Sequence, residues 1–342
     1  MTALTMPARP EEDTSLRPVP WRRMAWVTWR QHRIALGGVA VLLGALAVYL
    51  WLTGLQLHHA YAAVTAACHP AGSVACAQMT NSLNGTYVPH AVVAIILMQA
   101  APALIGAFVG APVLAREMET GTFRYAWTQG FGRWRWTLGK LVPLAIAVAA
   151  AGGACSVLFS WYYQPFFAEG FQTPLAPIVF GLRGVAFAAW TLAAFAIGAL
   201  AGMLIRRVVP AIAATLAVYA GLALAAGGFM RQHYLTPLVT SALNVPRSAW
   251  LISQWYTKGG KLAFAGVQKS GLNAERLQHF CPSAPPSETL GQCLSSRGYT
   301  QWTSYQPVGR FWPFQWIEGG WLLALSVLLI AATIWLVRRR AA

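Results

Sequence analysis

Six long apolar runs constrain the fold of this chain more than any other feature. A helix needs about 20 predominantly apolar residues to cross the hydrocarbon core of a bilayer, and each run reaches that length. Only 10% of the residues are charged, against about 25% in soluble domains. We therefore predict an all-α membrane protein with six transmembrane helices. The expected helices cover approximately residues 34–57, 91–114, 138–163, 178–205, 209–229 and 319–337.

The formal net charge of +16 invites comparison with nucleic-acid-binding proteins. Such proteins gather Lys and Arg on one solvated face. Here the basic residues lie mostly beside the ends of the apolar runs, which is the pattern of a topology signal. We expect no nucleic-acid partner.

The short loops predict the orientation of the chain in the membrane. The connections at residues 58–90 and 164–177 contain no Lys or Arg, whereas the two termini and the other short connections are basic. Cytoplasmic loops carry the excess of Lys and Arg, so both termini are expected in the cytoplasm, in a bacterial plasma membrane. The connection 230–318 is basic and is still expected outside, because long loops cross largely regardless of charge.

The N-terminal region divides into two parts. Residues 1–20 are polar and Pro-rich, which predicts a disordered cytoplasmic tail without a cleavable signal peptide. Residues 21–33 form an amphipathic pattern, because Arg22, Arg23, Arg30 and Arg33 share one arc at 100° per residue. Such a helix lies in the headgroup plane, where its cations attract anionic lipid. A plain juxtamembrane topology signal explains the same charges.

The cysteines divide by their place along the chain. Cys68 and Cys76 share the first outer connection, and Cys281 and Cys293 share the long outer loop 230–318. Disulfides persist outside the membrane, and four cysteines allow three pairings. We prefer pairing within each loop, because it requires no tertiary assumption. Cys155, inside the third helix, is expected to be a packing residue, and none of the spacings resembles a metal site.

The long outer loop is rich in Pro, Ser and Gly. This composition predicts short helices and irregular structure rather than a compact domain.

The connection after the second helix carries the most informative pattern. Residues 115–130 combine acidic and basic side chains, a Gly-Thr step and an apolar run. Gly121 is suited to an unusual backbone angle. Phe123 and Trp127 offer an apolar face that would dock on a partner protein.

These residues carry a resemblance to a known family. An Arg-Glu-x-x-x-Gly-Thr stretch, followed by a basic segment and a Gly-Lys-Leu entry into the third helix, resembles the permease subunits of ABC-2 type exporters. The matching residues are Arg116, Glu117, Gly121, Thr122, Arg133, Arg135, Gly139, Lys140 and Leu141. The stretches 21–33 and 310–318 resemble actinobacterial members. The chain departs from the pattern at residues 128–130, where the family often has Pro.

The resemblance implies a type V exporter-like permease fold, with an interfacial N-terminal helix and a long outer loop before the last helix. It also implies an ABC ATPase partner, a second permease subunit and a hydrophobic or amphiphilic substrate. The loop would hold the coupling helix, with contacts from Arg116, Glu117, Glu119, Gly121, Thr122, Phe123 and Trp127. The alternative is an ordinary interfacial loop whose charges set topology.

A nucleotide-binding motif within the chain can be tested directly. A phosphate-binding loop requires Gly-x-x-x-x-Gly-Lys-Ser/Thr. The two Gly-Lys pairs end at Lys140 and Lys261, but Trp stands at the first Gly position and Leu follows each Lys. We therefore expect a transport subunit that is not an enzyme, binds no cofactor itself and uses ATP bound to its partner.

Polar residues within the spans are candidates for the transport pathway. Gln99 lies near the middle of the second helix, one turn before Pro102, and Arg183 lies near the outer end of the fourth. Glu169 or Glu318 is the expected partner of Arg183, although snorkelling or helix–helix hydrogen bonding explains Gln99 and Arg183 as well.

Two Gly-x-x-x-Gly steps, at 106–110 and 198–202, allow close helix packing.

The sequence also bears on two other classes of membrane protein. An intramembrane hydrolase would need a base beside Ser156, Ser160 or Thr191, and no His falls within the expected helix interiors. An ATP-independent transporter or channel normally places ionisable groups along a midplane pathway. The expected spans are nearly free of such groups, so this class remains the alternative.

Overall fold

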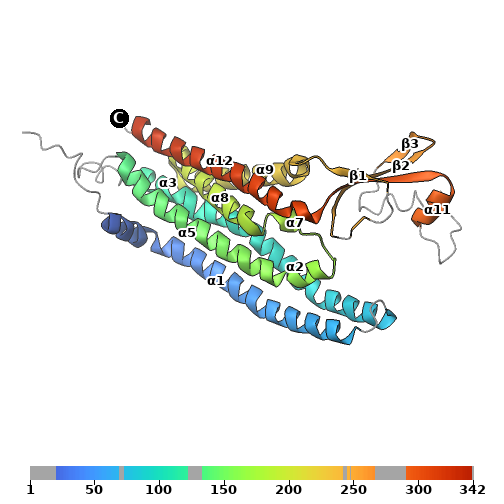
Figure 1. Cartoon of the computed structure of the whole chain (residues 1–342). Coiled ribbons are helices and arrows are strands. Elements are labelled where there is room, and N and C mark those ends of the chain that lie inside the picture. The colour runs from blue at the N-terminus through green and yellow to red at the C-terminus, as the bar shows by residue number, and fades with distance from the viewer. Residues whose placement is uncertain are drawn as a thin grey trace, which may run out of the picture.

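The computed structural model describes residues 21–68, 73–121, 133–241, 245–246, 248–265 and 290–340. In this part of the chain, six helices are long and apolar enough to cross a membrane, as the sequence predicts. They lie side by side in an elongated bundle, with a small β-sheet beyond one end (Figure 1). The six spans are Leu36–Ala67, Val74–Thr120, Trp134–Tyr162, Gly184–Ile205, Val208–His233 and Val308–Arg339.

The spans are built from longer and shorter elements. α2, η2 and α3 run on as one span, and α9 continues through η3 and η4. The π-helices are η2 (Gly106–Gly110) and η3 (Ala226–Met230), and the 3₁₀ helices are η4 (Arg231–His233) and η5 (Val308–Arg310). The α-helices are α1 (Trp21–Ala67), α2 (Val74–Ile105), α3 (Ala111–Thr120), α5 (Arg133–Tyr162), α6 (Gln164–Ala168), α7 (Pro177–Phe180), α8 (Gly184–Ile205), α9 (Val208–Ala225), α11 (Leu290–Ser296) and α12 (Phe311–Arg340).

α8 is the central helix of the bundle. It is the most buried of the six spans, and α5, α12, α3, η2 and α9 all pack against it. Its small residues allow this crowding: a Cβ at Gly106 or Gly110 on the second span would lie 2.6 Å from a carbonyl oxygen of α8. Gly198 and Gly202 face the same contact from α8. The two Gly-x-x-x-Gly steps therefore meet in one interface, where only glycine lets the backbones approach so closely.

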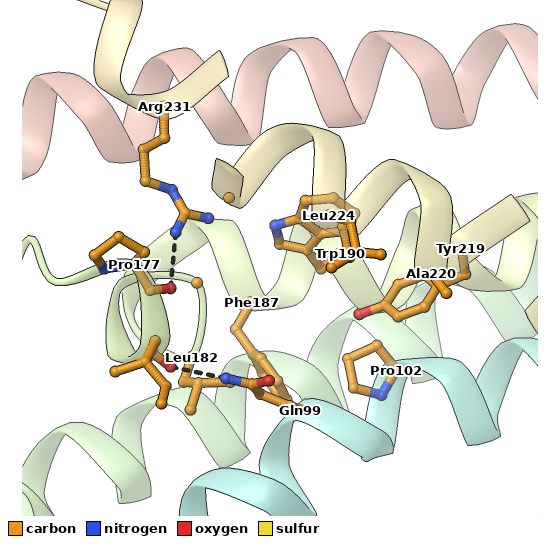
Figure 2. Close-up of a pocket in the computed structure, with 14 residues that line it drawn as sticks. Gln99, Pro102, Pro177, Leu182, Phe187, Trp190, Tyr219, Ala220, Leu224 and Arg231 are labelled. Atoms are coloured by element: carbon orange, nitrogen blue, oxygen red, sulfur yellow. Dashed lines mark hydrogen bonds between the residues drawn. The ribbon is translucent and has the colours of Figure 1, made fainter. Parts of the chain in front are cut away.

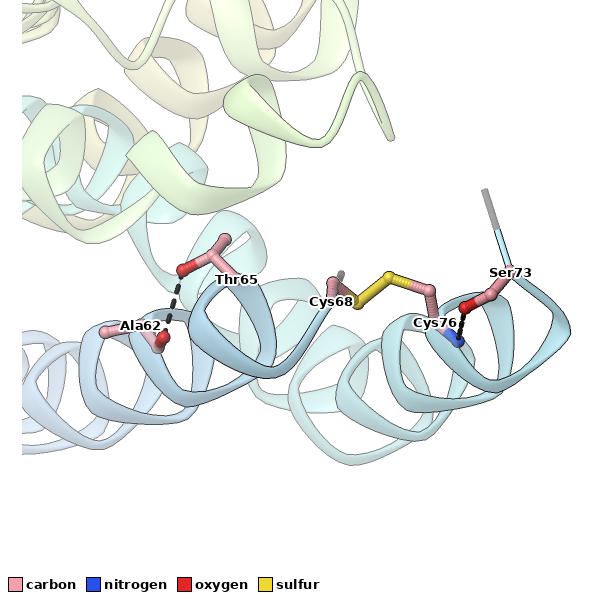
Figure 3. Close-up of a disulfide and its surroundings, with 5 residues drawn as sticks. All are labelled: Ala62, Thr65, Cys68, Ser73 and Cys76. Carbon is pink, nitrogen blue, oxygen red and sulfur yellow. Dashed lines mark hydrogen bonds between the residues drawn. A yellow bond between two sulfur atoms is a disulfide. The ribbon is translucent and has the colours of Figure 1, made fainter. Parts of the chain in front are cut away.

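The first two helices are longer than the sequence predicts. α1 extends to Ala67 and α2 begins at Val74, so most of residues 58–90 are helical rather than a loop. The two helices form a hairpin that projects past the rest of the bundle (Figure 1). A disulfide between Cys68 and Cys76 closes its tip, and the Ser73 hydroxyl caps α2 by accepting from the Cys76 amide (Figure 3). The absence of charge in this stretch suits helices that pack on each other.

α1 also includes the segment that we expect to lie in the headgroup plane. The helix begins at Trp21 and continues to Ala67, so residues 21–33 are its first part. Arg30 and Arg33 are exposed. The side chains of Arg22 and Arg23 lie outside the described residues.

The fourth predicted helix is divided. α7 ends at Phe180, and α8 begins at Gly184, which has a φ of +59°. An L-residue rarely adopts this conformation, and a helix cannot continue through it. Arg183 is consequently the extended residue before α8 rather than a member of a helix.

The outer loop contains a four-stranded antiparallel sheet, so the prediction of short helices and irregular structure is wrong for these residues. β1 (Leu238–Thr240), β2 (Trp250–Lys258), β3 (Lys261–Ala265) and β4 (Tyr299–Gln306) pair in the order β1-β4-β2-β3. Gly259 and Gly260, both with positive φ, form the two-residue turn between β2 and β3. Such turns favour Gly-Gly. Burial raises the pKa of Tyr256 on β2, and its hydroxyl donates to Gln301 Oε1 on β4 at 3.0 Å.

The two ends of the bundle are distinct. The C-terminus, the start of α1 and the end of α3 lie at one end, and the hairpin tip and the sheet lie at the other (Figure 1). In the expected topology, the first end faces the cytoplasm. We call the two ends the α3 end and the sheet end.

Candidate functional site

A buried ion pair joins α3 to α5 at the α3 end. The Lys140 ammonium donates to Glu117 Oε1, and both residues are buried. The same ammonium lies 4.4 Å from the centre of the Trp136 ring. An isolated buried charge costs several kcal/mol, so each of the two charges requires the other. The pair fixes α3 and α5 to each other on either side of the connection 122–132.

Sequence analysis did not identify Lys140 as the partner of Glu117. Lys140 was recognised only as part of the basic entry into the third helix. Its signal was its position seven residues into α5, beyond Trp136 and before a long apolar run. An ammonium there needs a carboxylate, and Glu117 is the acidic residue that the fold brings to it.

Glu119 connects the same end of α3 to α9. Its Oε2 accepts a hydrogen bond of 3.1 Å from the backbone amide of Val208, the first residue of α9. A carboxylate at this position satisfies a free amide and complements the helix dipole. Both carboxylates therefore have a partner within the chain. Their expected contact with an ATPase stays a prediction.

The structure describes the predicted coupling segment only as far as Gly121. Arg116 is exposed on α3. Gly121 ends the helix with a φ of +70°, the unusual backbone angle for which a glycine is suited. Thr122, Phe123 and Trp127 lie outside the described residues. Glu117 Oε2 has no hydrogen-bond partner within the described ranges.

A second buried ion pair lies toward the sheet end, between the end of α9 and α12. Arg231 Nη2 donates to Glu318 Oε1 at 2.7 Å, and Arg231 Nε donates to Oε2 at 2.9 Å. Arg231 is 3% exposed and Glu318 is fully buried. Two parallel bonds of this kind fix geometry as well as charge. The guanidinium also donates to the Pro177 carbonyl and lies 4.6 Å from the Phe180 ring centre.

Two further donors satisfy the Glu318 carboxylate. Trp190 Nε1 on α8 donates to Oε1 at 2.8 Å, and the Tyr234 hydroxyl donates to Oε2 at 3.1 Å. Burial and the neighbouring Glu318 charge raise the pKa of Tyr234. Trp321 Nε1 in turn donates to the Tyr234 oxygen at 3.0 Å. One carboxylate thus organises α8, α12 and the segment after α9.

A pocket of about 350 Å³ lies beside this network, between α2, α7, α8 and α9. Figure 2 shows Gln99 and Arg231 on its wall, with Trp190 and Tyr219 across it. Gln99 Nε2 donates to the Ile178 carbonyl at 2.9 Å. Most other lining residues are apolar, so the pocket combines an apolar wall with a few polar groups, as small-molecule sites do.

Within the described part of the chain, Arg183 pairs with neither Glu318 nor Glu169, so the expected ion pair is wrong. The other explanation, a hydrogen bond to a neighbouring helix, is the one that the structure shows. The Arg183 guanidinium lies 4.3 Å from the Phe167 ring centre and 5.1 Å from that of Phe311, and its Nε donates to Ser160 Oγ at 3.3 Å. Aromatic faces stabilise the cation. The reason is topological, since Glu318 already accepts from Arg231 and two other donors.

The hydroxyls that a hydrolase would need serve the backbone instead. Ser156 Oγ donates to the Gly184 carbonyl, Ser160 Oγ to that of Ser156, and Thr191 Oγ1 to carbonyls of its own helix. Among the described residues, no group of three His, Cys, Asp or Glu is arranged to hold a metal ion.

The outer disulfides differ in how far the structure describes them. Cys68 and Cys76 are joined. Cys293 is disulfide-bonded, but the predicted pairing with Cys281 falls outside the described residues, because Cys281 is not among them. Cys155 is a buried free thiol.

Comparison with known proteins gives one match. The family model described as "ABC-2 membrane transporter related" matches residues 40–231, which is more than half of the chain. The match contains three of the six spans whole and most of two others. No curated protein and no solved structure matches the chain. Families of this kind supply the membrane component of ABC transporters, in keeping with the six apolar helices. The chain therefore belongs to the ABC-2 membrane transporter related family.

Proposed function

We propose that this chain is the permease subunit of an ATP-driven exporter. It moves a hydrophobic or amphiphilic substrate across the bacterial plasma membrane, and a separate ABC ATPase subunit supplies the energy. A second permease subunit, either another copy or a related chain, completes the pathway. The observation that carries the proposal is the set of buried or capping contacts that join α3 to α5 and to α9, taken together with the family match.

The α3 end is built to transmit a movement of the connection 122–132. The Glu117–Lys140 pair fixes α3 to α5, and Glu119 fixes α3 to the start of α9. α3 continues through η2 into α2, and this span packs on the central helix α8 through glycine contacts. A displacement of the connection therefore moves a rigid unit of several helices, because close-packed interiors transmit strain rather than absorb it.

The pocket beside Gln99 is the proposed part of the pathway in this subunit. It lies between the spans that flank α8, and its wall is mostly apolar. Apolar walls with few polar groups suit a hydrophobic or amphiphilic molecule better than a hydrated ion.

The experiment measures ATPase binding and transport-coupled ATP hydrolysis with a candidate ABC ATPase subunit co-expressed with this chain. Phe123→Ala and Trp127→Ala are the test variants. Central aromatic anchors contribute about 2 kcal/mol or more to an interface, so each variant should weaken ATPase binding roughly thirtyfold. Phe229→Ala and Trp312→Ala are matched controls, because both side chains are exposed and belong to other elements, η3 and the start of α12.

The proposal fails if the test variants bind the ATPase and couple hydrolysis as the controls do. Transport by the purified chain alone, with no ATPase present, would instead favour the ATP-independent transporter.

A further inference from the structure

An apolar crevice lies among the helices α8, α9 and α12. It has a volume of about 620 Å³. This volume falls within the range of about 300–1,000 Å³ that holds drug-sized molecules. Its lining consists of Ile, Leu, Val, Ala and Gly side chains from the three helices. Leu204, Val218 and Gly221, which line it, are exposed, so the crevice is open to the surrounding bilayer.

Two basic residues directly follow the α8 residues that line the crevice. Its α8 wall finishes at Leu204 and Ile205, and the next two residues are Arg206 and Arg207, both exposed. Neither guanidinium forms an ion pair within the described part of the chain. Glu119 accepts a hydrogen bond from the Val208 amide beside them, so one carboxylate accompanies the two cations at this turn.

The backbone at this turn is unusual. Arg206 is the only described residue other than glycine with a positive φ, at +59°. Gly or Asn adopts this conformation at the end of a helix with less strain. An arginine held in a disfavoured backbone conformation, directly after the residues that line an apolar crevice, points to a role for its charge.

We propose that this crevice binds one anionic phospholipid. An acyl chain occupies the apolar space between α8, α9 and α12, and the phosphate lies against Arg206 and Arg207. Guanidinium groups bind phosphate through paired hydrogen bonds, and basic residues beside a membrane attract anionic headgroups. The site is distinct from the pocket beside Gln99 and does not depend on the transport reaction.

The acyl-chain part of the proposal is tested by filling the crevice. A Cβ at Gly221 would meet no described atom within 4 Å, so Gly221→Leu places a side chain in the crevice without a backbone clash. Gly44→Leu is the matched control, because Gly44 is an exposed glycine on α1 with equally open surroundings. Gly221→Ala is a milder variant with an intermediate effect, and it serves if the leucine variant fails to fold.

The headgroup part is tested by removing the two cations. Arg206→Asn with Arg207→Gln keeps a residue that tolerates positive φ. One basic residue near the headgroups is worth roughly a fivefold preference for anionic lipid, so the double variant should lose about 25-fold. Lys258→Gln with Lys261→Gln removes the same charge from the sheet, at the other end of the molecule.

Native mass spectrometry of the delipidated protein, titrated with phosphatidylglycerol or phosphatidylcholine, provides the readout. The wild type and both controls should retain one phosphatidylglycerol per chain in preference to phosphatidylcholine. Gly221→Leu should lose both lipids at this site, and the arginine variant should lose only the preference. The proposal is overturned if Gly221→Leu and Gly44→Leu bind alike, if the preference survives the arginine variant, or if Gly221→Leu abolishes a dimer while leaving lipid binding unchanged.

Discussion

Replacing Glu318 by Gln should destabilise the sheet end of the bundle, because it leaves the Arg231 guanidinium buried without a counter-charge. Glu318 is fully buried and accepts from Arg231, Trp190 and Tyr234. Removing one partner of a buried ion pair costs about 3–5 kcal/mol. At roughly 2 °C per kcal/mol for a chain of this size, the unfolding temperature should fall by about 6–10 °C.

A second substitution separates charge from packing. Arg231→Met combined with Glu318→Gln removes both charges and keeps an oxygen that accepts from Trp190. This double variant should recover most of the lost stability, since a buried pair replaced as a whole is often neutral. Lys261→Gln, at an exposed position on the sheet, is the control for a single charge change and should shift stability by less than about 0.5 kcal/mol.

Thermal unfolding in one detergent, followed by tryptophan fluorescence, measures these changes. Trp190 and Trp321 lie within the network and report on it directly. A fall of less than about 2 °C for Glu318→Gln, or a double variant no more stable than the single, would refute the reasoning from a buried and mutually dependent pair.

Three other predictions follow from the fold. Gly198→Leu should abolish monodisperse protein in size-exclusion chromatography, because its Cβ would lie 2.7 Å from a backbone nitrogen of α3. Gly153→Leu enters open space and should be tolerated. Equal behaviour of the two variants would contradict the glycine contact. Cys68→Ser should destabilise the hairpin tip by about 2–3 kcal/mol, seen as faster amide exchange there with the bundle unchanged; unchanged exchange would mean that the disulfide is dispensable. In a cysteine-free background, Ser82→Cys should be labelled from outside the cell and Thr122→Cys from inside, and the reverse pattern would invert the proposed orientation.

The helical extensions show why element ends were harder to predict than spans. The run ending near residue 57 met the length that a bilayer requires, so the prediction stopped there. α1 and α2 nevertheless continue to the Cys68–Cys76 disulfide, and Ala60, Val64 and Leu83 belong to one packed cluster along this hairpin. Partner burial, rather than hydropathy, sets the end of such a helix.

The sheet was hidden by composition. Pro, Ser and Gly across residues 230–318 indicated irregular structure, while the local pattern around Gly259 and Gly260 was that of a hairpin. The register that places Trp255 opposite Trp302 joins segments on either side of residues 266–289. Pairing at that separation leaves no signature in either strand alone.

For the candidate site as well, the sequence determined some features and the tertiary structure decided others. The sequence by itself determined that six helices cross the membrane, because apolar length is a local property, and it located the loop that carries the family motif. Only the tertiary structure decided which charges pair: Lys140 with Glu117, and Arg231 with Glu318, 87 residues away. The sequence offered Glu169 or Glu318 as a partner for Arg183, beside snorkelling or hydrogen bonding between helices. In the fold, Glu318 pairs with Arg231, and Arg183 donates to Ser160. Which buried charges meet depends on how helices pack, and packing is a property of the whole chain.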